Sequence, residues 1–248
     1  MITIKNKKDI AAMRRAGQEL SRILKEVRSL VKPGITTMEL DRKADYLIQE
    51  KGYQAAFKNY NGFPNALCTS VNEAAVHQVP GDYQLQKGDL LSLDLGLVKD
   101  GYYADMAYTV GIGEVGAEKQ RLMKVTRQAL QAGIKQLRPQ KTLGDIGHAI
   151  QKVVESNGFT VVEDLCGHGI GRTLHEDPNV LNFGQAGHGL TLRPGMVFCL
   201  EPIVSTGGKD IKRGPDGQSY ITKDNSLTAH YEHMVAVTKD GPEVLTSF

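Results

Sequence analysis

The sequence predicts an α+β fold made of two related halves, and three observations lead to this prediction. Two long segments have helical periodicity, and each is followed by a shorter helical segment. The two long-and-short pairs match one another in spacing, which indicates an internal repeat. Between them, residues 90–110 alternate apolar and polar side chains around a turn, as a strand hairpin does.

The first half opens with two predicted helices. Residues 7–30 carry apolar side chains at three- and four-residue spacing, the pattern of an amphipathic helix. The Pro33-Gly34 pair follows and ends this helix. Thr36, with Glu39 three residues later, then forms a capping box. This signal predicts a second helix that stops near Gly52.

The same pattern returns in the second half. Residues 117–137 have helical periodicity, and Thr142 with Asp145 repeats the capping signal. Six positions match with a constant offset of 106 and no gap: Pro33, Thr36, Leu40, Leu47, Gly52 and Tyr53 correspond to Pro139, Thr142, Ile146, Val153, Gly158 and Phe159. We therefore predict duplicated helix–helix–strand units. They form halves of about 1–112 and 113–248, packed into one domain over 1–248.

The hairpin carries two aspartates. Asp100-Gly101 is a strong turn signal, because glycine accepts the positive φ that such turns require. If the turn centres there, Asp94 lies opposite Ala107, and Asp105 lies opposite Gly96. Both carboxylates then project from one face as diagonal neighbours whose backbones are roughly 7–8 Å apart. On an apolar sheet they would repel each other unless a cation is shared. The alternative is a pair of solvated aspartates on an exposed face.

Composition narrows the class of protein. The 30 basic and 28 acidic residues give a net charge of +2, which does not favour nucleic-acid or membrane binding through bulk electrostatics. The N-terminal residues contain no apolar signal segment, and no apolar stretch is long enough to span a membrane. Three widely spaced cysteines indicate reduced thiols. A soluble cytoplasmic protein is the prediction.

The second half adds further candidate residues. An offset of one more residue carries Asp94 to Glu201, so equivalent carboxylates are expected to meet at a pseudo-twofold axis. Residues 166–171 are predicted to form a glycine-rich turn that fixes the direction of His168. A phosphate-binding loop is the rival interpretation, but its glycine spacing is absent. Glu232 stands at the start of a strand-like run.

Taken singly, each of these residues is more often structural than functional. Together they offer four carboxylates and one imidazole: Asp94, Asp105, His168, Glu201 and Glu232. Oxygen-rich sites with one nitrogen suit Mn(II), Fe(II) or Co(II), with Zn(II) also possible. Four carboxylates around one cation would leave excess negative charge. Two divalent ions bridged by carboxylates fit better, and such a pair activates water and clamps a scissile carbonyl.

In their settings DLG, YAD, GHGIG, LEP and YEH, these five residues resemble the metal ligands of the pita-bread metallopeptidases, most closely the bacterial type I methionine aminopeptidases. The resemblance covers nearly the whole chain. It implies the creatinase/aminopeptidase-like fold, with duplicated units around a curved antiparallel sheet. It also implies a monomeric cytoplasmic enzyme that removes the initiator methionine from nascent polypeptides with a small second residue. Contact with the ribosome would be transient.

The resemblance implies a role for each metal ligand. Asp94 and Asp105 would bind metal, with Asp105 and Glu232 bridging the two ions. His168 and Glu201 would complete the tighter site. Glu201 would also be the general base toward the water that attacks the scissile carbonyl.

Other residues are implied around the substrate. His77 and His175 would hydrogen-bond the substrate near the scissile amide, and a neutral imidazole is suited to donate there. Tyr60, Phe63 and Cys68 match positions that line the methionine pocket, where a polarizable wall suits a thioether. From the residues alone, His77 would be a partly buried loop histidine, and Tyr60, Phe63 and Cys68 would be ordinary core residues.

The sequence departs from the family at five positions, where glycine, phenylalanine, tryptophan, glutamine and threonine are common. They are Gln78, Leu174, Gln218, His230 and Met234. None removes a metal ligand, and all are expected near the substrate or around the ligands, where they would tune specificity, rate or metal preference. Residues 209–217 carry charges and turn residues and indicate a solvated loop.

Two rival functions follow from the same residues. One keeps the fold and takes Xaa-Pro peptides or another N-terminal residue. Such enzymes generally carry an extra N-terminal domain, whereas the first capping box here begins at Thr36. The other is a binding module that has lost catalysis. A module of that kind is expected to lose ligands, and all five are present here with both histidines.

Overall fold

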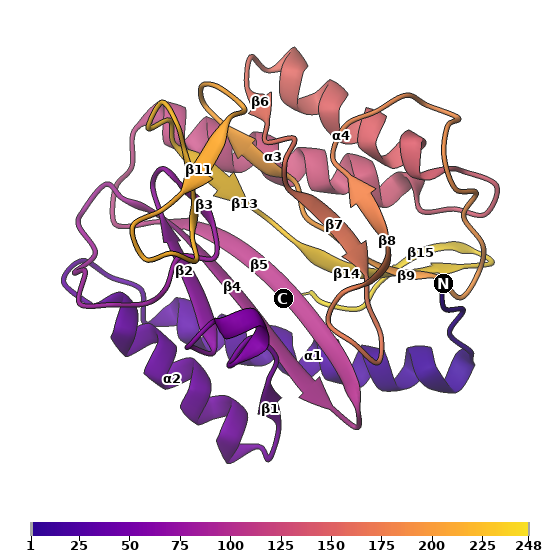
Figure 1. Cartoon of the computed structure of the whole chain (residues 1–248), viewed down its shortest axis with the longest axis horizontal. Helices are drawn as coiled ribbons and strands as arrows, with labels where there is room; N and C mark the ends of the chain where they lie inside the picture. Colours follow the sequence, from indigo (N-terminus) through magenta and orange to yellow (C-terminus); the bar gives the residue numbers. More distant parts are fainter. Residues whose placement is uncertain (1, 248) are drawn as a thin grey trace.

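The computed structural model describes residues 2–247, in which two helical pairs lie beside antiparallel strands (Figure 1). The helices are α1 Lys7–Ser29, α2 Thr37–Glu50, α3 Ala117–Gln136 and α4 Leu143–Ser156, with a short 3-10 helix η1 Tyr60–Gly62. No helix in residues 2–247 combines the length and the apolarity that crossing a membrane requires. The strands that the first half contributes are β1 Gln54–Ala55, β2 Leu67–Val71, β3 Ala74–Val76, β4 Leu90–Lys99 and β5 Tyr102–Gly111.

The second half contributes more and shorter strands. They are β6 Thr160–Val161, β7 Cys166–Gly169, β8 Glu176–Leu181, β9 Val197–Leu200, β10 Ile203–Ser205, β11 Ile211–Arg213, β12 Tyr220–Thr222, β13 Thr228–His230, β14 His233–Thr238 and β15 Gly241–Val244. Every pairing between these strands is antiparallel. The predicted α+β class is confirmed.

The short helix of each half begins at the predicted capping box. Thr36 Oγ1 accepts from the backbone N of Glu39 at 3.1 Å, and the Glu39 carboxylate accepts from Thr36 N at 2.7 Å. Thr142 and Asp145 repeat both bonds, at 3.2 and 2.8 Å. Such reciprocal bonds satisfy two of the backbone donors that a helix start leaves free. The helical pairs therefore start as the sequence predicts.

Backbone hydrogen bonds repeat between the halves beyond the helices. Leu85 N donates to Ile35 O at 2.9 Å, and Leu192 N donates to Lys141 O at 2.7 Å. In each half this bond ties the entry to the short helix to the chain that leads into the central strands. The offset has grown by one residue at this point, from 106 at Ile35 to 107 at Leu85. It is therefore the offset that the sequence predicts for Asp94 and Glu201.

The central hairpin has the predicted register. In the β4–β5 ladder Asp94 lies opposite Ala107, and Gly96 lies opposite Asp105. The second half continues the same kind of ladder through β9 and β10, which pair with β14 and β13. Its register makes Glu201 the counterpart of Asp94 and His230 the counterpart of Asp105.

An independent pair of hydrogen bonds fixes this correspondence. Ile112 N donates to Asp89 O at 2.8 Å in the first half, and Val237 N donates to Met196 O at 2.8 Å in the second. The step from Ile112 to Val237 is the same as the step from Asp105 to His230. The duplicated units and the pseudo-twofold relation of the predicted fold are therefore present in the backbone.

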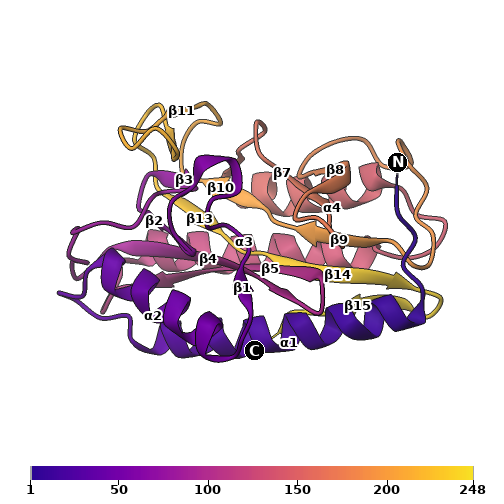
Figure 2. The same cartoon turned by 60° about the horizontal axis from the view of Figure 1, so that its bottom comes forward.

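Two apolar cores lie mainly in one half each, although the first also includes buried residues of β9 and β14. One joins α1 and α2 to β4 and β5, and the other joins α3 and α4 to β9, β13 and β14. Strand β3 of the first half pairs with β12 of the second. Figure 2 shows the β11–β12 segment on the side of the molecule away from α1. That the chain forms one domain stays a prediction.

Candidate metal centre

Four acidic side chains and one imidazole meet at the centre of the strands. Asp94 lies in β4, Asp105 in β5 and His168 in β7. Glu201 directly follows β9, and Glu232 stands between β13 and β14. All five line the same cavity, and only Glu201 is more than slightly exposed. The structure thus brings together the residues that the sequence predicts as metal ligands.

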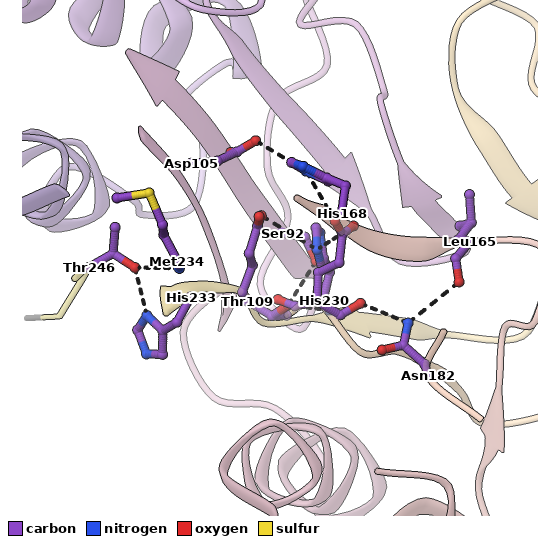
Figure 3. A network of polar contacts seen from close by, with 12 residues as sticks. Ser92, Asp105, Thr109, Leu165, His168, Asn182, His230, His233, Met234 and Thr246 are labelled. Atoms are coloured by element: carbon purple, nitrogen blue, oxygen red, sulfur yellow. Dashed lines mark hydrogen bonds and ion pairs between the residues drawn. The ribbon is translucent and has the colours of Figure 1, made fainter. Parts of the chain in front are cut away.

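His168 is oriented with one ring nitrogen toward the carboxylates. Its Nδ1 donates to Gly169 O at 2.8 Å, which leaves the Nε2 lone pair available in the neutral ring. Nε2 lies 3.5 Å from Glu201 Oε1 and 3.9 Å from Asp105 Oδ2 (Figure 3). A backbone carbonyl that fixes one imidazole nitrogen in this way is the usual support for a metal-binding histidine.

The prediction of a glycine-rich turn around His168 is wrong, because residues 166–169 form strand β7. The glycines serve strand packing. A Cβ on Gly167 would lie 2.2 Å from Cys199 O, and a Cβ on Gly169 would lie 2.4 Å from Asp177 O. The close approach that these glycines permit is therefore to the neighbouring strands β9 and β8.

Burial dominates the electrostatics of the cluster. It raises the pKa of Asp94 to about 7. Burial also raises the pKa of Asp105, Glu201 and Glu232 well above the ordinary range, and neighbouring carboxylates add repulsion to each. The pKa of His168 falls to about 3, again mainly through burial, so its ring is neutral. Without a cation, the cluster is an unfavourable concentration of acidic groups.

The donor set fits divalent cations. Three buried carboxylate oxygens have no hydrogen-bond partner among residues 2–247: Asp94 Oδ1, Asp105 Oδ1 and Glu232 Oε1. Leaving such atoms unpaired is costly, and a bound cation supplies both the charge and the missing bonds. Carboxylate oxygens with an imidazole nitrogen suit divalent ions.

A cavity of about 440 Å³ opens beside the cluster. Tyr60, Phe63 and Cys68 line it, as predicted, together with Phe57 and Leu174. Phe63 and Cys68 are buried, and Tyr60 is half-buried. The cavity therefore has an apolar wall facing a group of carboxylates and histidines.

The interpretation of residues 209–217 as a solvated loop is partly wrong. Arg213 and Gly217 line the cavity together with Gln218, although Arg213 is exposed on its outer side. Residues 211–213 form β11, which pairs with β12, and β12 pairs in turn with β3. This long-range pairing brings a charged segment over the cavity. The composition of residues 209–217 does not predict that placement.

Two further histidines stand over the cluster. His77 has a left-handed backbone with φ 59°, and burial lowers the pKa of its ring to about 4. His175 Nδ1 lies 2.7 Å from Tyr60 Oη, and its ring centroid is 4.3 Å from that of His168. Burial lowers the pKa of His175 as well. Both rings are neutral at neutral pH and line the cavity.

The five family departures are not equivalent in the structure. Leu174 and Gln218 line the cavity, and His230 lies beside the carboxylates. Met234 is buried opposite Cys199. Gln78 instead accepts a hydrogen bond from the backbone N of a β2 residue, Val71, at 2.8 Å. Its side chain supports the strand.

Cys199 is a candidate donor that the sequence analysis missed. Its sulfur belongs to a group with ligand atoms of Asp105, His168 and Glu232, all within 4.8 Å of one another. The available signal was its position two residues before Glu201 in a strand, because alternate residues share a face.

The model of metallopeptidase family M24 matches residues 11–239. The chain belongs to this family. It is 44% identical over 246 residues to the methionine aminopeptidase of Clostridium perfringens, covering 99% of both chains. It is 41% identical to that of Escherichia coli, covering 99% of this chain and 94% of the relative. The predicted family is confirmed, and M24 membership implies the use of divalent metal.

Solved structures show the same fold. The methionine aminopeptidases of Rickettsia prowazekii and Thermotoga maritima each match with a TM-score of 0.98 and 40% identity over the whole of both chains. A prolidase of Pyrococcus horikoshii matches with a TM-score of 0.79 at 21% identity, over 98% of this chain and 63% of the prolidase chain. The predicted pita-bread fold is confirmed.

Proposed function

We propose that the chain is a methionine aminopeptidase, a metal-dependent hydrolase that removes N-terminal methionine from polypeptides with a small second residue. The observation that carries the proposal is the cluster of four carboxylates and one imidazole in a cavity whose other wall is apolar. The high-coverage identity to methionine aminopeptidases supports the same activity.

Five residues are proposed to hold two divalent ions: Asp94, Asp105, His168, Glu201 and Glu232. Asp105 and Glu232 are the proposed bridges. Their pKa values rise partly through repulsion from neighbouring carboxylates, and a shared cation would relieve it. When bound, the ions supply a water of lowered pKa and Lewis-acid polarisation of the scissile carbonyl.

Glu201 is the proposed general base. Its side chain is 14% exposed, against 3% for Glu232, so it reaches the cavity where the attacking water must lie. Burial and the neighbouring carboxylates give Glu201 a strong affinity for a proton. It would take the proton of the water and deliver it to the leaving amine.

His77 and His175 are the proposed hydrogen-bond donors to the substrate. If Tyr60 donates its hydroxyl proton to His175 Nδ1, the ring proton of His175 sits on Nε2. A neutral imidazole in that tautomer donates to the developing oxyanion or to the scissile amide. His77 is neutral through burial and offers the same chemistry from the β3 side.

Tyr60, Phe63 and Cys68 are the proposed methionine pocket. They form part of an apolar wall beside the carboxylates, and aromatic rings and a thiol make favourable contacts with a thioether. A methionine side chain lying there would direct its own α-amino group and carbonyl toward the cluster.

The proposed metal ions are Mn(II), Fe(II) or Co(II), with Zn(II) possible, since the donors are mostly carboxylates with one imidazole. The proposed substrates are the N-termini of nascent polypeptides, and the proposed form of the enzyme is a monomer in the cytoplasm. Any ribosome contact would be transient. The small net charge of +2 agrees with a protein that has no nucleic-acid specificity.

The proposal is tested by measuring methionine release from Met-Ala-Ser. Metal-free protein is supplied in turn with Mn(II), Fe(II), Co(II) or Zn(II), with a chelator control. Ala-Pro-Ser serves as the second substrate. We expect metal-dependent release from the methionine peptide alone.

Other outcomes would replace the proposal. Cleavage of the proline peptide in place of the methionine peptide would keep the metal centre and discard the pocket assignment. Metal binding without cleavage of either peptide would indicate a binding module.

A further inference from the structure

His230 is a buried histidine for which the predicted metal centre has no role. It is 2% exposed, and neither Nδ1 nor Nε2 has a hydrogen-bond partner among residues 2–247. Buried polar atoms are nearly always paired, so a ring with both nitrogens unpaired requires an explanation. In the pseudo-twofold relation between the halves, His230 occupies the position of Asp105.

The surroundings of His230 resemble those of His168. His230 Nε2 lies 3.7 Å from Glu201 Oε2 and 4.0 Å from Glu232 Oε2. His168 Nε2 lies 3.5 Å from the other oxygen of Glu201 and 3.9 Å from Asp105. Glu201 therefore stands between two imidazoles, one facing each oxygen.

These separations suit donors that share an ion. With bonds of about 2.0–2.2 Å, two donors on one ion lie at most about 4.3 Å apart. Both His230 contacts fall within that limit. They are too long for hydrogen bonds, which end near 3.2 Å for a nitrogen donor.

The backbone holds His230 in place. Its N donates to Thr109 Oγ1 at 2.9 Å, and Thr109 Oγ1 donates to its O at 2.7 Å. The β10–β13 ladder adds the pairing of His230 with Ile203. The ring thus faces Glu201 and Glu232 from a backbone fixed on both sides, as a side chain that binds metal requires.

We propose that His230 Nε2 is a sixth donor of the metal centre and shares with the bridging Glu232 the ion that His168 does not bind, so that each of the two ions has one imidazole. This inference rests on the proposed metal centre and adds a ligand to it. A second imidazole favours borderline ions such as Zn(II), Co(II) and Fe(II) over Mn(II), because imidazole suits these ions better than carboxylate-preferring ones.

Zinc titration of metal-free protein labelled with ¹⁵N-histidine tests the proposal. Long-range ¹H–¹⁵N spectra report each imidazole nitrogen, and single variants assign the seven histidines. We expect Nε2 of both His168 and His230 to move to the zinc-bound position. Equilibrium dialysis is expected to give two zinc ions per chain, with the Kd of the weaker ion at least about tenfold higher in His230→Gln.

His233→Gln is the matched control. His233 is three residues away, and its Nδ1 lies 3.2 Å from Thr246 Oγ1, facing a separate cleft beside α3. This variant should bind both ions as the wild type does. The wild-type spectrum decides the question even if His230→Gln fails to fold.

Two results would overturn the inference, and they differ in what else they overturn. Two bound zinc ions with an unchanged His230 Nε2 signal would reject the sixth donor and leave the proposed metal centre intact. A wild-type protein that binds no zinc, manganese or cobalt would reject both.

Discussion

The two halves of this protein have the same backbone frame and different chemistry. Asp94 and Glu201 occupy equivalent positions, and so do Asp105 and His230. His168, from β7, has no counterpart of its kind in the first half, where the register gives Ser70 instead. The shared backbone thus fixes the positions of the donor residues, whereas the side chains at those positions differ between the halves.

The halves also differ where their central ladders end. In the first half β4 turns into β5 through Asp100 and Gly101 alone. In the second, the ladder breaks at Pro202, which has no N–H to donate, and residues 206–227 separate β10 from β13. That excursion carries β11 and β12 to the cavity. The symmetric part of the fold builds the cluster of carboxylates, and the asymmetric part contributes to the rim of the cavity.

Removing one carboxylate tests whether both halves are needed for one centre. Asp105→Ala and Glu232→Ala should each lower kcat/KM at least about 10⁴-fold, the scale of losing a group that acts as part of a catalytic unit. Metal binding should fall with turnover, because each is a proposed bridge. The checks are steady-state kinetics and equilibrium dialysis, with Glu243→Ala on β15 as the control. Normal turnover in either variant would reject the bridged centre.

The cluster also makes the metal-free protein sensitive to pH. The pKa of Asp94 is raised to about 7, above its unfolded value near 3.9, so folding favours its protonated form. The contribution of Asp94 to stability is therefore fully present below about pH 4 and is lost as pH rises to about 7, on the order of 4 kcal/mol for this group. Chemical unfolding of chelator-treated protein at pH 5 and pH 8 measures it. Asp94→Asn should remove this contribution, so the wild type should lose more stability than the variant between pH 5 and pH 8. An equal change in the two proteins would contradict the prediction.

Variants of His175 and Tyr60 compare a residue that is proposed to contact the substrate with the residue that positions it. His175→Ala should lower kcat about 10²-fold or more, because it removes a donor to the reacting amide. Tyr60→Phe keeps the ring and removes only the 2.7 Å bond to His175, so a loss of about fivefold to tenfold is expected. Peptide kinetics of both variants provide the comparison. Equal losses would mean that the tyrosine hydroxyl itself contacts substrate.

Removal of a helix cap has the smallest expected effect on the free energy of unfolding, and this effect should be equal in the two halves. Thr36→Ala and Thr142→Ala each remove one capping box, so each should lower the free energy of unfolding by about 1 kcal/mol. Urea unfolding of the metal-bound protein measures both changes. Thr142 is nearly buried, so a much larger loss there would show that packing has made the caps unequal.

Local signals predicted much of this structure. Each capping box, and the Asp100-Gly101 turn, involves residues only a few positions apart, so its consequence can be worked out from the sequence. The offset between the halves, lengthened by one residue, extended that reasoning to Glu201. The resemblance to a family then joined the carboxylates with His168, which no local rule connects.

Other features depend on contacts between distant segments. Arg213 lines the cavity because β12 pairs with β3, and nothing in residues 209–217 signals that pairing. His168 was expected in a turn because its flanking glycines usually mark one. They are needed here for strands that pack closely on both sides. Cys199 was passed over as one apolar residue among several in β9.

The excursion between β10 and β13 starts and ends at neighbouring points, because Ser205 pairs directly with Thr228. Paired residues in an antiparallel ladder stay about 5 Å apart whatever chain connects them. Residues 206–227 can therefore be replaced as one segment without moving the two strands that they connect. Grafting the corresponding segment from a relative should change the rim of the cavity, where Arg213 and Gln218 lie, while the ladder keeps the cluster of carboxylates unchanged.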